Sequence, residues 1–91
     1  MTTNIDFMMR MVKSYLSGET PRYIFELDFQ TEILARYKKM VRENKAFAEL
    51  FYDQLSETGV DLGDGLSDAE FKSLIRKQFN SVKDMEGDGF Y

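Results

Sequence analysis

The 91-residue chain contains no cysteine, no histidine and no tryptophan, and it has a single proline. Without cysteine, the chain forms no disulfide and has no thiolate nucleophile. Without histidine as well, it lacks zinc sites built from Cys and His and the general base of a Ser-His-Asp triad. These absences remove the commonest routes to catalysis and to zinc binding. We therefore expect no enzyme activity, no cofactor and no metal.

Long apolar segments are also missing. No run of apolar residues approaches the ~20 that a membrane-spanning helix requires. The first residues show neither the basic region nor the continuous apolar stretch of a signal peptide. We therefore expect a cytoplasmic protein that does not enter the membrane.

What the chain does contain is a large share of apolar residues. They make up 43% of the chain, and Phe and Tyr alone account for 14%. Such a composition is too hydrophobic for a disordered chain. At this length we predict one domain, residues 1–91, with a modest core and a frayed C-terminal tail at about 87–91.

Apolar residues recur mainly at helical spacing, which predicts an all-α domain built as a small bundle of four main helices. We expect these helices at about 4–17, 29–43, 45–57 and 68–85. Thr3 and Asp6 are expected to cap the first helix, and Gly18 to end it. Asn44 interrupts the apolar stripe of the middle region. We predict a break there, with Asn44 capping a third helix that ends near Gly59.

The segment 21–29 is ambiguous. Its aromatic and apolar residues Tyr23, Phe25, Leu27 and Phe29 fall at every second position, which is the period of a strand. No other segment alternates convincingly, and a lone strand would leave its backbone N–H and C=O groups unpaired. We therefore predict a short fifth helix near 21–27, separate from the helix at 29–43.

The stretch 60–71, VDLGDGLSDAEF, has acidic residues and glycines in an order that suggests a calcium-binding EF-hand loop. Such a loop needs oxygen ligands from position 1 onward, Gly at position 6 and a bidentate Glu at position 12. With Gly65 at position 6, position 1 is Val60 and position 12 is Phe71. With Glu70 at position 12, position 1 is Gly59. Neither register supplies the first and the last ligand together, so we expect no calcium site.

The same stretch predicts a helix start instead. Ser67 and Glu70 have the spacing of a capping box, in which each side chain binds the backbone N–H of the other residue. Leu66 and Phe71 fall at the positions of a hydrophobic staple. The two preceding glycines, Gly63 and Gly65, are expected in a turn with unusual backbone angles.

Two sets of residues suggest a protein partner. Phe7 and Met11 widen the apolar stripe of the first helix past half its circumference, and Met packs adaptably against varied shapes. The simpler alternative is that both residues belong to a deep core. Self-association in a homodimer would also explain the excess width.

The second set is acidic. Glu49, Asp53 and Glu57 lie at i, i+4 and i+8 of the third predicted helix, within a stretch, 46–70, that has no Lys or Arg. Paired carboxylates can act as acid and base or hold Mg²⁺, but these lie opposite the apolar face and point outward. We therefore predict a small cytoplasmic protein-interaction or regulatory module, whose partner is another protein or a second copy.

Nucleic-acid binding is the alternative function. Phosphate contacts need several Lys and Arg side chains on one surface. The basic faces of the helices at 29–43 and 68–85 offer such residues: Arg36, Lys39, Arg42, Lys72, Arg76 and Lys77. Two observations weaken this alternative. The net charge is −4, and the connection between residues 57 and 68 is too long for the turn of a helix-turn-helix motif.

Overall fold

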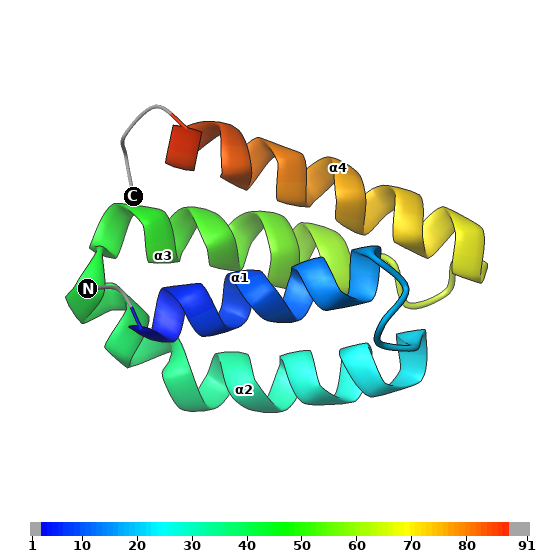
Figure 1. The fold of residues 1–91 in the computed structure, drawn as a ribbon, viewed down its shortest axis with the longest axis horizontal. Helices are drawn as coiled ribbons and strands as arrows, with labels where there is room; N and C mark the ends of the chain where they lie inside the picture. Colours follow the sequence, from blue (N-terminus) through cyan, green and yellow to red (C-terminus); the bar gives the residue numbers. More distant parts are fainter. Residues whose placement is uncertain (1–2, 88–91) are drawn as a thin grey trace.

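The computed structural model describes residues 3–87 and shows an all-α bundle of four helices, as the sequence predicts (Figure 1). The helices are α1 (Thr3–Leu16), α2 (Arg22–Glu43), α3 (Lys45–Phe51), which continues directly into the π-helix η1 (Tyr52–Asp61), and α4 (Asp68–Gly87). α1 packs antiparallel on α2, and α4 packs along η1 on the opposite side of the bundle from α2. Among residues 3–87, no helix is long and apolar enough to cross a membrane.

The core is rich in aromatic rings. Five phenylalanines are fully buried: Phe25, Phe29, Phe47, Phe51 and Phe71. The ring of Tyr15 on α1 stacks on Phe25 of α2 with 4.5 Å between centroids, and Phe29 stacks on Phe51 of α3 at 6.0 Å. Full burial of each such side chain stabilises the fold by roughly 1.5–3 kcal/mol. These rings therefore tie the first three helices to one another.

The segment 21–29 is helical but does not form a helix of its own. α2 runs without a break over 22 residues, so the prediction of a separate short helix near 21–27 was wrong. Phe25 and Phe29 lie one turn apart and are fully buried, whereas Tyr23 and Leu27 are 73% and 67% exposed. The sequence alternates here because α2 carries apolar residues on two faces.

The break at Asn44 is confirmed. Its side chain accepts a hydrogen bond from the Phe47 N–H at 3.1 Å and so caps α3. The helix continues further than we expected, through η1 to Asp61. Gly59 does not end it but lies buried inside it, where a Cβ atom would come within 3.0 Å of Ile75 Cδ1. Gly59 thus allows close approach of α4.

The capping box at the start of α4 is confirmed. Ser67 Oγ accepts from the Glu70 N–H at 3.3 Å, and Glu70 Oε1 accepts from the Ser67 N–H at 3.4 Å. Unusual backbone angles at the two preceding glycines were a wrong prediction. Within residues 3–87 the glycine with positive φ is Gly18, which follows α1 as expected. Gly63 is required for another reason, since a Cβ there would lie 2.6 Å from Phe71 Cδ1.

The start of α1 is capped from a distant part of the chain. Glu43, the last residue of α2, accepts hydrogen bonds from the Asn4 N–H at 2.9 Å and the Ile5 N–H at 3.0 Å. These are backbone N–H groups that a helix start leaves without an intrahelical partner. We had expected the cap from Thr3 and Asp6; the Thr3 side chain lies outside the described part of the chain. So do residues 88–91, most of the predicted tail.

Candidate protein-interaction surface

α2 has a second apolar stripe that the core does not cover. Tyr23, Leu27 and Leu34 are 73%, 67% and 78% exposed. At about 100° per residue these three positions lie within about 40° of one another around the helix, so they form one face. Scattered exposed apolar residues are normal, whereas contiguous apolar patches often mark interaction sites, so this row is a candidate contact surface.

The spacing of this outer stripe is that of a helix-packing seam. Positions 23, 27, 30, 34 and 37 are separated alternately by four and three residues, which is the a/d pattern of a coiled coil. Gln30 is exposed and Tyr37 half-buried. The seam therefore spans most of α2 and presents one polar position between its apolar ones.

The seam continues onto η1. A hollow of about 360 Å³ opens between the two helices, lined by Gln30, Ile33, Leu34, Tyr52, Ser56 and Asp61. The rings of Tyr37 and Tyr52 pack across the same junction with 5.1 Å between centroids. We call this surface the α2–η1 face, defined by Tyr23, Leu27, Gln30, Leu34 and Tyr37 of α2 and Tyr52 of η1.

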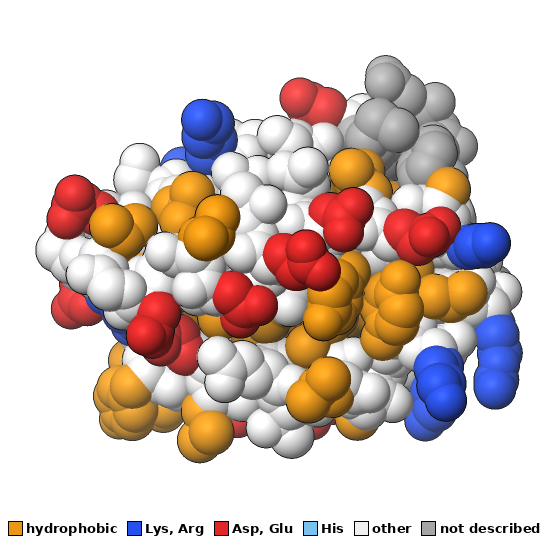
Figure 2. Space-filling view, turned by 180° about the vertical axis from the view of Figure 1, so that it is seen from behind, with side chains coloured by type: hydrophobic (Ala, Val, Ile, Leu, Met, Phe, Trp, Pro, Cys, Tyr) orange, Lys and Arg blue, Asp and Glu red, His pale blue; other side chains and the backbone are white. Residues whose placement is uncertain are grey.

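The predicted acidic residues border this face. Glu49, Asp53 and Glu57 are all exposed, and so is Asp61 at the end of η1. Seen from behind, acidic side chains form a row over α3 and η1, with hydrophobic side chains gathered below it (Figure 2). Burial raises the pKa of Tyr37, and the nearby carboxylates of Glu49 and Asp53 raise it further. Two carboxylates of the row thus lie near enough to Tyr37 to favour its protonated phenol.

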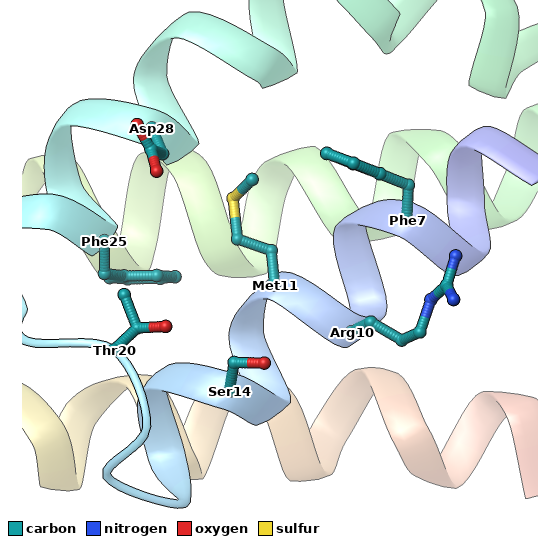
Figure 3. A pocket seen from close by; sticks show the side chains of 7 residues that line it. All are labelled: Phe7, Arg10, Met11, Ser14, Thr20, Phe25 and Asp28. Carbon is teal, nitrogen blue, oxygen red and sulfur yellow. The ribbon is translucent and has the colours of Figure 1, made fainter.

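Phe7 and Met11 lie elsewhere. Both are half-buried against the core and line a separate groove of about 400 Å³ between α1 and α2, with Arg10 and Asp28 at its rim (Figure 3). The Arg36 guanidinium covers the Phe7 ring at 3.8 Å from its centroid. The structure thus does not bring Phe7 and Met11 together with the acidic row on α3 and η1.

The six basic residues predicted to bind nucleic acid do not gather on one surface. Three lie in the C-terminal half of α2. The other three lie in the first half of α4, on the opposite side of the bundle (Figure 1). Arg36 is held by Glu32 at 2.8 Å and by Asn4 Oδ1 at 2.8 Å. The remaining five side chains are exposed or half-buried: Lys39, Arg42, Lys72, Arg76 and Lys77.

Two of the α4 residues also contact the protein itself. Arg76 Nη2 donates to the Leu16 carbonyl at 3.3 Å, and Lys72 Nζ lies 5.6 Å from the centroid of the Tyr15 ring. Both interactions hold the end of α1 against α4. They leave Lys39, Arg42 and Lys77 as the members of the set without such a contact in the described structure.

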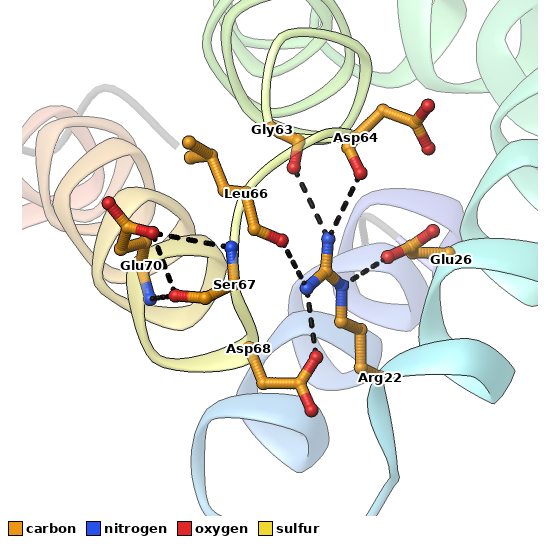
Figure 4. A network of polar contacts seen from close by, with 8 residues as sticks. All are labelled: Arg22, Glu26, Gly63, Asp64, Leu66, Ser67, Asp68 and Glu70. Carbon is orange, nitrogen blue, oxygen red and sulfur yellow. Dashed lines mark hydrogen bonds and ion pairs between the residues drawn. The ribbon is translucent and has the colours of Figure 1, made fainter.

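Sequence reasoning missed Arg22, which organises the acidic loop before α4 (Figure 4). Its Nη1 donates to the Leu66 carbonyl at 2.8 Å and to Asp68 Oδ1 at 2.9 Å. Its Nη2 donates to the Gly63 and Asp64 carbonyls, both at 3.3 Å. The acidic loop before α4 thus surrounds a guanidinium from α2. Among residues 3–87, no group of three potential metal ligands converges.

Comparison of the chain with protein-family models, with curated proteins and with solved structures finds no match. The function therefore has to be inferred from the α2–η1 face itself.

Proposed function

We propose that this protein is a small protein-interaction module whose contact surface is the α2–η1 face, and that it has no catalytic role. One observation carries the proposal: Tyr23, Leu27 and Leu34 form an exposed row on α2 at helix-packing spacing. Covering each of these side chains with a partner would remove a large apolar area from water, which is the main favourable term in protein association. The proposed location is the cytoplasm, as expected from the sequence.

The composition of the face supports this proposal. Aromatic residues are enriched in protein interfaces, and the face contains Tyr23, Tyr37 and Tyr52 beside two leucines. The carboxylates of Glu49, Asp53 and Glu57 lie at its edge, exposed to water. Charged residues at the rim of an apolar patch are typical of a binding surface and affect mainly the association rate and the choice of partner.

Site-specific photo-crosslinking tests the proposal. A photoreactive phenylalanine analogue is placed at Leu27 or Leu34 in the full chain, which is expressed in the cells that make the protein. The matched control carries the analogue at Asn80, an exposed position on α4. We expect defined adducts, with another protein or a second copy, from positions 27 and 34 but not from position 80. Equal yields from all three positions would refute the proposed surface.

A further inference from the structure

The charge around the α2–η1 face is uneven. On its η1 side four exposed carboxylates follow one another: Glu49, Asp53, Glu57 and Asp61. The chain has no Lys or Arg from residue 46 to residue 71 that could neutralise them. The ion pairs of the described structure join Arg22 to Glu26 and Asp68, and Arg36 to Glu32, so none of them includes this row.

We infer that the α2–η1 face binds an amphipathic helix with basic residues along one edge. Apolar side chains of this helix would pack on Leu27, Leu34 and Tyr52, and its Lys or Arg side chains would face Asp53, Glu57 and Asp61. This inference rests on the proposed function and adds the chemistry of the partner. It uses the groove mode of helix recognition, in which residues at i, i+3 or i+4 and i+7 serve as anchors.

The dimensions of the face agree with a helical partner. From Tyr23 to Leu34 the seam is about 16 Å long at the rise of an α-helix, which corresponds to about three turns of a facing helix. The hollow of about 360 Å³ beside Leu34 is large enough for an anchoring side chain of the partner helix. The acidic row runs along η1 beside the seam, so the basic residues of the partner need to lie on only one edge.

A second copy of this chain fits the face less well. In an antiparallel two-fold pair through α2, both η1 segments lie on the same side, and the two acidic rows face each other. In a parallel pair, Lys38 and Arg42 are the basic side chains of α2 on the edge that faces the acidic row of the other copy, and they lie at one end of the seam, so Glu57 and Asp61 meet no basic side chain of α2. The antiparallel pair thus places like charges together, which disfavours association, and the parallel pair neutralises only part of each acidic row.

Two synthetic helical peptides test the inference. They share the same leucine positions at i, i+3, i+4 and i+7, and one carries lysine while the other carries glutamate at the flanking positions. Binding to the full chain is measured by fluorescence anisotropy at low and high salt. We expect the lysine peptide to bind at least about tenfold more tightly than the glutamate peptide, and the difference to shrink as salt screens the rim charges.

Variants of the chain locate the binding. Leu34→Lys should weaken binding of the lysine peptide by about tenfold or more, since the substitution places a positive charge in the seam. The double variant Asp53→Lys/Glu57→Lys should reverse the preference in favour of the glutamate peptide. Asp84→Lys on α4 is the matched control, because it is exposed and changes charge outside the face. It should leave the preference in place, and circular dichroism confirms that each variant is folded.

Equal binding of both peptides, or unchanged binding by Leu34→Lys, would overturn the inference. Sedimentation separates this outcome from failure of the proposed function. If the wild-type chain dimerises and Leu34→Lys is monomeric, the face binds a second copy: the inference fails and the proposed function stands. If the photo-crosslinking yields no adducts specific to the face, the proposed function fails as well.

Discussion

α2 carries two stripes of large apolar side chains, one buried in the core and the other exposed to solvent. The inner stripe contains Phe25, Phe29, Ile33 and Met40, all buried, and the outer stripe contains Tyr23, Leu27 and Leu34, all exposed. Both repeat at helical spacing over the same 22 residues. Residue type and spacing thus show that each stripe can pack against another helix or another protein surface. Only the positions of the neighbouring helices show which stripe the chain itself covers.

The largest expected effect tests the inner stripe. Phe29→Ala should lower the free energy of unfolding by about 3–5 kcal/mol, because it removes a fully buried ring that stacks on Phe51. Urea denaturation followed by circular dichroism measures the change. Phe29→Leu is the control and should cost less, since it keeps most of the buried volume. A loss below about 1 kcal/mol for Phe29→Ala would contradict the assignment of this stripe to the core.

The next effect concerns the anchoring of α2. Arg22→Met should cost about 1.5–3 kcal/mol, because it leaves the carbonyls of Gly63, Asp64 and Leu66 without their charged donor. Arg22→Lys should recover only part of this loss, since an ammonium group lacks the planar fork of donors. Denaturation in urea again gives the values. Equal stability of the Arg22→Met variant and the wild type would show that water replaces the guanidinium at no cost.

The outer stripe should behave in the opposite way to the inner one. Leu27→Ser and Leu34→Ser should change the free energy of unfolding by no more than about 0.5 kcal/mol, because both side chains are already largely exposed. The same variants should lose binding to the lysine peptide. A loss of stability like that of Phe29→Ala would place Leu34 in the core and remove the distinction between the two stripes.

The smallest effect tests whether the acidic row raises the pKa of Tyr37 in the outer seam. The pKa of Tyr37 is raised by burial and by the charges of Glu49 and Asp53, so the folded state favours the protonated phenol. Its contribution to stability is complete below the ordinary pKa of 10.0 and is lost as the pH rises through the higher pKa of the folded state. Asp53→Asn should lower the pKa of Tyr37.

Tyrosinate absorbance during an alkaline titration measures this change. Tyr37→Phe identifies the contribution of Tyr37 to the curve, and Asp84→Asn on α4 is the matched control that should leave it unchanged. An unaltered titration of Tyr37 in the Asp53→Asn variant would mean that the charge of Asp53 does not raise the pKa of Tyr37.

Local features of the fold were predictable because their causes lie within a few residues. The Asn44 cap, the Ser67–Glu70 capping box and the end of α1 at Gly18 each depend on neighbouring positions. The outward direction of Glu49, Asp53 and Glu57 followed from the helical period. Contacts over long sequence separations were not predictable. Glu43 caps α1 from 38 residues away, and Arg22 reaches carbonyls more than 40 residues further along the chain.

The sequence by itself determined the all-α class, the order of the helices and the acidity of the segment 46–70, because these depend on composition and on periodicity along one chain. Only the tertiary structure decided which face of α2 is core, why Arg22 occupies the acidic loop and where the acidic row meets an apolar seam. Two apolar stripes on one helix have equivalent local patterns. Their difference arises from the surface that the other helices leave uncovered.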